Sequence, residues 1–196
     1  MLVKICGLTT LDAVEAAVAA GADAVGFVFA RSPREVTPER AAELSAGVPA
    51  RVKRVAVMRH PAPARVRRVL EVFAPDWLQT DAADLAQIEL PPGCAPLPVL
   101  RTGSGATAGA PARVLFEGLT SGSGRLADWD EARELARHRE LVLAGGLTPD
   151  NVADAIRAVR PWGVDVSSGV EQSPGRKDPV KIREFVARVR AMEDAR

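Results

Sequence analysis

The chain has 196 residues, which suits a single domain large enough to bury most of its apolar surface. It is 47% hydrophobic and 26% charged with a net charge of +1, so nothing points to nucleic acid or an anionic membrane as a partner. Two cysteines are too few for a disulfide framework, no signal peptide is visible, and no apolar run approaches the roughly 20 residues that span a bilayer, so we expect a cytoplasmic protein.

Apolar runs alternate with amphipathic runs along the chain. The apolar runs have the length and residue types of strands, and we predict eight of them, at residues 2–7, 23–30, 53–60, 77–81, 97–102, 113–118, 141–146 and 163–170. Apolar residues spaced by three and four predict helices at residues 11–20, 38–46, 62–73, 128–138, 149–159 and 179–192. Thr37 and Thr148 each precede a proline, which favours them as helix N-caps.

Two of the expected helices are weak. Residues 82–89 form at most a short helix, and residues 103–112, rich in Gly, Ala, Ser and Thr, predict a loop in place of the fifth helix. Strands that alternate with helices predict a parallel sheet, and eight units in this length suit a compact (β/α)8 TIM barrel in which residues 1–196 form a single domain. An open doubly wound sheet is the alternative, but no G-x-G-x-x-G motif follows the first strand.

The active site of such a barrel lies at the C-terminal ends of its strands. Cys6 ends the first strand and is followed by Gly7, so its thiol is either a small buried hydrophobe or a group that faces the pocket. Strand alternation places Lys4 on the same face, and a buried lysine needs a partner. Because the first and eighth strands are neighbours in a closed barrel, we predict an ion pair between Lys4 and Asp165.

Glu117 ends the sixth strand, after the apolar run Val114-Leu115-Phe116. It is either a solvated carboxylate at a strand end or an acid whose pKa is raised by apolar walls. In the second interpretation, a Cys6 thiolate and a Glu117 carboxylic acid on opposite sides of a pocket form a general base and a general acid.

Glycines and serines follow the seventh and eighth strands, at residues 144–147 and 167–169. Barrels of this kind often bind phosphate at these two strand ends through backbone N–H groups, which glycine lets approach closely. Arg34 lies just past the second strand, and a cation there is either a solvated loop residue or a ligand for an anionic substrate group.

Four segments together resemble the phosphoribosylanthranilate isomerase family. They are KICGLT at residues 4–9, GADAVGFVF at 21–29, LAGGL at 143–147 with PDNV at 149–152, and DVSSGVE at 165–171 followed by PGRKD at 174–178. The resemblance implies an isomerase of tryptophan biosynthesis that works without a cofactor or a metal. Its reaction is an Amadori rearrangement of N-(5-phosphoribosyl)anthranilate to 1-(2-carboxyphenylamino)-1-deoxyribulose 5-phosphate.

The resemblance also implies roles for single residues. Cys6 is the general base that removes the C2 proton of the ribose, Glu117 stands where the family has the acid that protonates the ring oxygen, and Arg34 matches the arginine that binds the anthranilate carboxylate. The other substrate-binding residues that we expect are Gln79, Asp81, Gly145, Gly146, Asp165, Ser167, Ser168 and Gly169. The expected partner is a small phosphorylated molecule, and the expected assembly a monomer or homodimer.

Two positions depart from the family pattern. The strand-6 acid is typically Asp, and Glu117 is longer by one methylene, about 1.5 Å. The fourth strand usually ends Gln-Leu-His-Gly but here ends Gln79-Thr80-Asp81-Ala82, so the histidine is missing and a negative charge stands near an anionic substrate. Because of these two departures, an alternative hypothesis is a barrel that binds phosphate without catalysis and serves as a binding module. A different sugar-phosphate isomerase is a third hypothesis, which Cys6 and Arg34 disfavour.

Overall fold

The computed structural model describes residues 1–103, 112–118 and 127–194 of the chain. Within these residues, eight parallel strands form a closed barrel in chain order, and the last strand pairs with the first. The strands are β1 (Leu2–Cys6), β2 (Ala24–Val28), β3 (Lys53–Val57), β4 (Trp77–Asp81), β5 (Ala95–Arg101), β6 (Arg113–Glu117), β7 (Glu140–Leu143) and β8 (Gly163–Val166). The predicted TIM barrel is therefore confirmed, and closure excludes the open doubly wound sheet.

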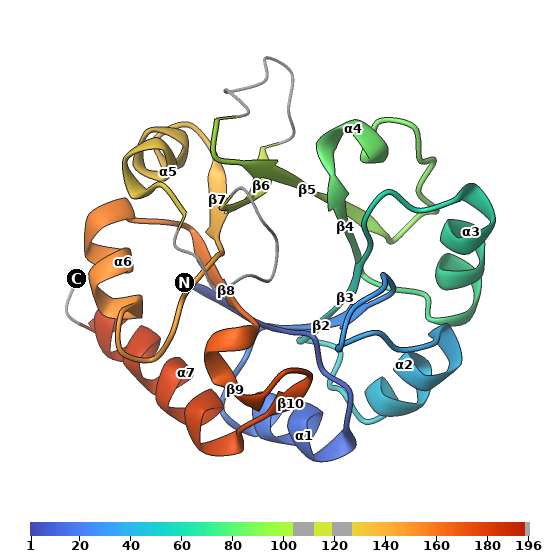
Figure 1. The fold of residues 1–196 in the computed structure, drawn as a ribbon, viewed down its shortest axis with the longest axis horizontal. Helices are drawn as coiled ribbons and strands as arrows, with labels where there is room; N and C mark the ends of the chain where they lie inside the picture. The colour runs from blue at the N-terminus through green and yellow to red at the C-terminus, as the bar shows by residue number, and fades with distance from the viewer. Residues whose placement is uncertain (104–111, 119–126, 195–196) are drawn as a thin grey trace.

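Helices surround the barrel (Figure 1). Among the described residues they are α1 (Leu11–Ala19), α2 (Pro38–Ser45), α3 (Pro63–Val72), α4 (Ala82–Leu85), α5 (Trp129–Ala136), α6 (Val152–Val159) and α7 (Pro179–Asp194). The weak helix predicted after β4 is the single turn α4. The loop predicted in place of a helix between β5 and β6 falls mostly on residues 104–111, outside the described residues. None of the described helices is long and apolar enough to cross a lipid bilayer.

One predicted N-cap is correct and the other is wrong. The Thr37 side chain caps α2 by accepting a hydrogen bond from the backbone N–H of Arg40. At α6, however, the N-cap is Asn151 and not Thr148. The Asn151 amide instead ties down the chain before the helix: its Oδ1 accepts from the Thr148 N–H at 2.8 Å and its Nδ2 donates to the Gly146 carbonyl at 2.9 Å. The residues between them therefore form a turn.

Buried side chains fill both faces of the strands, as expected for a parallel sheet covered by helices. The larger core lies between strands and helices, where Phe73 contacts Phe27 and Phe29. A second cluster fills the barrel interior and consists of Ala24, Val55, Trp77, Leu97, Val99, Leu115, Val142 and Ala144, with Leu2 packed against it. Because strand residues alternate between faces, Lys4 and Cys6 point into the interior together with Leu2.

After β8 the chain differs from the expected long strand. The strand ends at Val166, residues 168–170 form a single 3-10 turn, and a short antiparallel hairpin follows, β9 (Glu171–Ser173) with β10 (Arg176–Lys177). The hairpin turn contacts the loop between β1 and α1, where the Thr9 hydroxyl donates to the Gly175 carbonyl at 2.9 Å. Its turn is Pro174-Gly175, with Gly175 at a φ of 81°, and a Pro-Gly dipeptide is itself typical of a turn.

Candidate active site at the C-terminal end of the barrel

The predicted ion pair between Lys4 and Asp165 is present inside the barrel. The two residues are register partners on β1 and β8, and the Lys4 Nζ lies 2.8 Å from the Asp165 Oδ1. Lys4 is fully buried. Burial disfavours its charged form, but the negative groups of Asp165 and Cys6 outweigh this effect, so the pKa of Lys4 is raised. The ammonium group is therefore a fixed positive charge below the mouth of the barrel.

Cys6 lies one layer above Lys4, and Gly26 on β2 makes room for both. A Cβ at Gly26 would stand 3.1 Å from the Cys6 Sγ and 3.2 Å from the Lys4 Cε. Cys6 is 6% exposed. Burial raises its pKa and Asp165 adds to this, whereas the charges of Lys4 and Lys177 act in the opposite direction. Cys6 is thus a buried thiol whose thiolate, once formed, has two ammonium groups to stabilise it.

A second charged cluster joins the β2–α2 loop to the hairpin. Arg34 contacts Glu171 through two parallel bonds, Nε to Oε1 at 2.7 Å and Nη2 to Oε2 at 2.8 Å. Lys177 donates to the same Oε1 at 2.8 Å and to the Ser167 carbonyl at 3.0 Å. Burial opposes ionisation of Glu171, but Arg34 and Lys177 overcome it, and the pKa of Glu171 is lowered. Glu171 and Lys177 lay within a motif of the sequence, and our prediction gave them no role.

Gly7 brings this second cluster next to Cys6. Its φ is 74°, and a Cβ there would lie 2.5 Å from the Arg34 Cδ and 3.0 Å from the Ser167 Oγ. The aliphatic part of Arg34 therefore crosses directly over Gly7, which leaves no space for a side chain. The glycine that follows Cys6 is what allows Arg34 and Ser167 to approach the end of β1.

The glycine-bearing loops after β7 and β8 meet backbone to backbone. Gly145 and Gly146 both have positive φ, 89° and 68°. A Cβ at Gly169 would stand 1.9 Å from the Leu147 carbonyl oxygen, far inside van der Waals contact. Gly169 and the neighbouring Ser168 begin the turn after β8, so the two predicted phosphate loops are brought together.

Glu117 is paired with a cation. Its Oε1 lies 2.9 Å from the Arg101 Nη2, and its side chain is 13% exposed. Arg101 and Glu117 are register partners at the ends of β5 and β6, and the Arg101 Nη1 also pairs with the Asp81 Oδ1 at the end of β4. Arg101 is a residue that our sequence reasoning missed, although it ends a strand just as Glu117 does.

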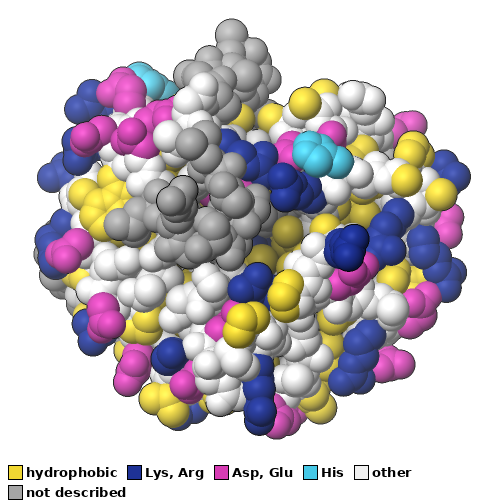
Figure 2. All heavy atoms as spheres, in the orientation of Figure 1, with side chains coloured by type: hydrophobic (Ala, Val, Ile, Leu, Met, Phe, Trp, Pro, Cys, Tyr) yellow, Lys and Arg dark blue, Asp and Glu magenta, His cyan; other side chains and the backbone are white. Residues whose placement is uncertain are grey.

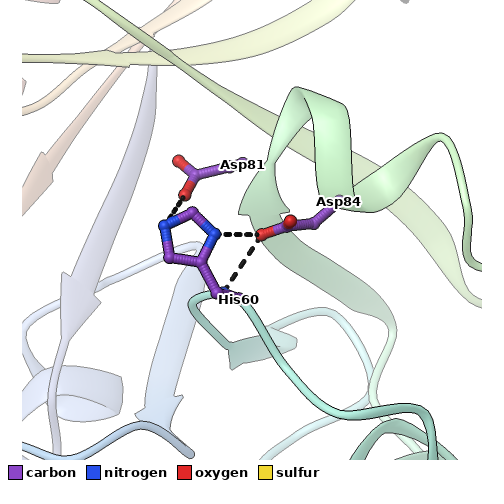
Figure 3. Close-up of side chains that lie close together, drawn as sticks. All are labelled: His60, Asp81 and Asp84. Atoms are coloured by element: carbon purple, nitrogen blue, oxygen red, sulfur yellow. Dashed lines mark hydrogen bonds and ion pairs between the residues drawn. The ribbon is translucent and has the colours of Figure 1, made fainter.

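His60, in the loop after β3, extends this group of charges (Figure 3). Its Nδ1 lies 3.0 Å from the Asp84 Oδ2 and its Nε2 lies 3.5 Å from the Asp81 Oδ2. The ligand atoms of the three residues lie within 4.8 Å of one another, so they could hold a metal ion. Asp81 Oδ1 pairs with Arg101, and Asp84 accepts from the His60 backbone N–H at 3.0 Å. The buried Asp81 Oδ2 has no hydrogen-bond partner among the described residues. In Figure 2 a histidine stands beside basic and acidic side chains near α4.

Gln79 is the remaining predicted site residue on β4. It is buried and shares the interior face of the strand with Trp77. Its Oε1 has no hydrogen-bond partner among the described residues. A buried acceptor of this kind calls for an explanation, and a ligand hydroxyl would supply one.

The model of the N-(5'-phosphoribosyl)anthranilate (PRA) isomerase family matches residues 3–188 of this chain. An N-(5'-phosphoribosyl)anthranilate isomerase from Streptococcus pneumoniae is 44% identical over 193 residues, which cover 96% of this chain and 95% of that protein. The crystal structure of TrpF from Jonesia denitrificans covers 100% of both chains at 38% identity with a TM-score of 0.85.

A further similar structure is a phosphoribosyl anthranilate isomerase in complex with reduced 1-(o-carboxyphenylamino)-1-deoxyribulose 5-phosphate. It is 31% identical, covers 97% of this chain and 100% of its own, and has a TM-score of 0.77. The solved relatives share the closed barrel described above. The chain belongs to the phosphoribosylanthranilate isomerase family, and it is an isomerase of tryptophan biosynthesis.

Proposed function

We propose that the chain carries out the Amadori rearrangement of N-(5-phosphoribosyl)anthranilate with Cys6 as general base and Glu117 as general acid. The observation that carries the proposal is the buried thiol at the end of β1, flanked by two lysines. Membership of the family and the ligand of the solved relative support a phosphorylated aminosugar with a carboxyphenyl group as substrate.

Cys6 takes the proton from C2 of the open-chain sugar. Burial raises the pKa of its thiol, so the thiolate forms at a cost, and a base with a raised pKa is in return a stronger proton acceptor. Lys4 and Lys177 limit that cost because their charges favour the thiolate. Asp165 acts through Lys4, which it holds at 2.8 Å.

Glu117 gives a proton to the ring oxygen and so opens the furanose. To do this it must carry a proton when substrate is bound, whereas the Arg101 guanidinium at 2.9 Å favours its carboxylate form. Asp81 contacts the same guanidinium and draws part of its charge away from Glu117. The contact with Arg101 therefore opposes the protonated form that the proposed acid needs.

Two anionic groups of the substrate need partners. We assign the phosphate to backbone N–H groups of Gly145, Gly146, Ser168 and Gly169, with Ser167 beside them. The assignment rests on the contact between the two loops and on the close approach that glycine permits. We assign the anthranilate carboxylate to Arg34, whose guanidinium Glu171 holds in a fixed orientation, and a substrate hydroxyl to the Gln79 Oε1.

Gly169→Ala should raise KM for the phosphorylated substrate by roughly 10–100-fold, because the new Cβ would stand 1.9 Å from the Leu147 carbonyl oxygen and force the two loops apart. Gly47→Ala is the matched control, since no atom lies within 4 Å of a Cβ at Gly47. Steady-state kinetics measure both variants. An unchanged KM in a folded Gly169→Ala protein would contradict the assignment of the phosphate to these loops.

A coupled fluorescence assay that follows the loss of phosphoribosylanthranilate tests the proposed function with purified protein. Turnover, together with growth of a tryptophan auxotroph that lacks the isomerase, is the expected result. Binding of a phosphorylated ligand without turnover or growth would instead favour the binding module.

A further inference from the structure

The β9–β10 hairpin carries a buried ion pair. Glu171 begins β9 and Lys177 ends β10, and the two are register partners, so their side chains leave the same face of the hairpin. The Lys177 side chain is fully buried and the Glu171 side chain is 5% exposed. The hairpin turn is fixed against two loops, since Thr9 donates to the Gly175 carbonyl at 2.9 Å and a Cβ at Gly175 would stand 2.3 Å from the Pro33 carbonyl oxygen. The hairpin thus holds this pair at the C-terminal end of the barrel.

Lys177 has no donor left for a ligand. It donates to the Glu171 Oε1 at 2.8 Å, to the Ser167 carbonyl at 3.0 Å and to the Ser167 Oγ at 3.2 Å. These three contacts account for all three N–H groups of an ammonium group. Lys177 therefore ties the hairpin to the residue that follows β8, and its contacts hold other groups in place.

Arg34, by contrast, keeps donors free. Glu171 occupies the edge of the guanidinium that Nε and Nη2 form, at 2.7 and 2.8 Å. The Arg34 Nη1 has no hydrogen-bond partner among the described residues. A guanidinium has five N–H donors, so the edge formed by Nη1 and Nη2 still offers one donor on each nitrogen in the geometry that a carboxylate accepts. Glu171 thus orients Arg34 without using up the edge that a ligand needs.

The side chains of Arg34, Lys177 and Glu171 carry a net charge of +1. Within the part of the chain that the structure describes, Glu171 is the one carboxylate that pairs with either cation. The neighbouring pair of Lys4 and Asp165 is balanced by itself. A buried charge without a counterion is costly, so the cluster favours a ligand that brings one negative charge. The aryl carboxylate of the proposed substrate supplies that charge.

We propose that Glu171 and Lys177 are positioning residues that determine the preference of the enzyme for a substrate whose aryl group carries a carboxylate. Lys177 fixes Glu171, and Glu171 fixes the guanidinium of Arg34 so that its Nη1–Nη2 edge is available to the carboxylate. The inference rests on the proposed function, in which Arg34 binds the anthranilate carboxylate. It places the specificity for that carboxylate in the β9–β10 hairpin as well as in Arg34 itself.

The binding of two stable ligands measures this preference separately from catalysis. One is 1-(2-carboxyphenylamino)-1-deoxyribulose 5-phosphate reduced at C2, and the other is the same molecule with a phenyl group that lacks the carboxylate. The ratio of their Kd values, from titration calorimetry, gives the preference for the carboxylate. Turnover is a poorer measure, because the charge of Lys177 also acts on the Cys6 thiol.

The double variant Glu171→Gln with Lys177→Met separates orientation from charge. It removes one negative and one positive charge, so the net charge of +1 is kept and no buried lysine is left unpaired. We expect the preference for the carboxylate to fall by roughly 10–100-fold, the range of a hydrogen bond to a charged group, with a smaller change in the Kd of the ligand without a carboxylate. A folded double variant that keeps the natural preference would overturn the proposal.

Glu171→Gln alone is a second test, in which orientation and charge predict opposite results. The net charge of the cluster rises to +2, so an attraction that depends on charge alone would tighten the binding of the carboxylate ligand. The amide, however, offers Arg34 one acceptor in place of two, and we expect the loss of orientation to weaken that binding by roughly tenfold. Unchanged or tighter binding would contradict the positioning role. Glu35→Gln is the matched control: Glu35 pairs with Arg65 in the same loop and is 38% exposed, and the preference should not change.

Arg34→Gln distinguishes this inference from its premise. It should remove most of the preference for the carboxylate, because the donors themselves are lost. If the natural preference survives in Arg34→Gln, the carboxylate binds elsewhere, and the assignment to Arg34 fails together with this inference. If Arg34→Gln loses the preference while the Glu171 and Lys177 variants keep it, the positioning role alone fails.

Discussion

Cys6→Ser should lower kcat by about 10²–10⁴-fold, the range that a positioned general base contributes. The hydroxyl fits the space that Gly26 leaves for the thiol and loses its proton far less readily, so the barrel should fold while the base is lost. The KM should change little, because the loops after β7 and β8, to which we assign the phosphate, and the Arg34 side chain are untouched. Steady-state kinetics and a thermal melt of each protein measure the two effects separately.

Cys94→Ser is the matched control for this experiment. Cys94 is also a free cysteine, half-buried in the loop before β5, and burial raises the pKa of its thiol to about 11. It lies beside Asp76 and Leu78, near the start of β4 and therefore at the opposite end of the barrel from the site. Its replacement should leave kcat unchanged. Near-normal turnover in Cys6→Ser would remove Cys6 from the mechanism.

The pH dependence of the natural enzyme follows from the same thiol. Because burial raises the pKa of Cys6, the fraction of thiolate is small at neutral pH and increases as pH rises. Titration of the thiolate by its ultraviolet absorbance should therefore show this step above neutral pH in the natural enzyme and lack it in Cys6→Ser. A step well below neutral pH would contradict the raised pKa of Cys6.

Strand periodicity and barrel closure predicted the part of the site that depends on local position. Alternation placed Lys4 and Cys6 on one face, and closure made β8 the neighbour of β1, so the buried pair of Lys4 and Asp165 could be expected before any coordinates. The same rule placed Glu117 at a strand end. These predictions need the order and direction of the strands and no knowledge of how the loops pack.

Contacts between loops could not be predicted in this way. Arg34 and Glu171 are 137 residues apart, and their pairing depends on the β9–β10 hairpin folding back against the loop after β2. A Cβ at Gly175 would stand 2.3 Å from the Pro33 carbonyl, which shows how closely the two segments pack. Nothing in the periodicity of either segment specifies that contact, because loop packing depends on the three-dimensional course of both chains.

Asp81 on the fourth strand is a second example of a residue whose contacts the sequence did not predict. The sequence shows that Asp81 replaces a histidine of the family pattern, and from this we expected an extra negative charge near the substrate. The structure pairs that charge with Arg101 and brings His60 to it from the neighbouring loop. The carboxylate at position 81 thus has partners from two other segments, the loop after β3 and the end of β5. A comparison of single positions with the family pattern does not show that these segments meet.

Glu117→Gln should lower kcat by about 10²–10⁴-fold, since an amide cannot give a proton to the ring oxygen. The shape of the side chain is kept, so the loss should appear in kcat with a modest change in KM. Glu140→Gln is the matched control: Glu140 is also paired with an arginine, Arg113 at 2.7 Å, but it begins β7 at the far end of the barrel. Glu140→Gln should turn over normally.

Glu117→Asp distinguishes a site built around glutamate from a tolerated replacement. The shorter side chain withdraws the carboxyl group by about 1.5 Å. Because Arg101 and Glu117 are register partners and meet at 2.9 Å, this withdrawal breaks the contact that orients the acid. A misplacement of this size can cost up to about 100-fold, so we expect kcat to fall by roughly 10–100-fold, less than in Glu117→Gln. A higher kcat in Glu117→Asp would mean instead that the longer acid is a compromise and that Arg101 restrains it without helping the reaction.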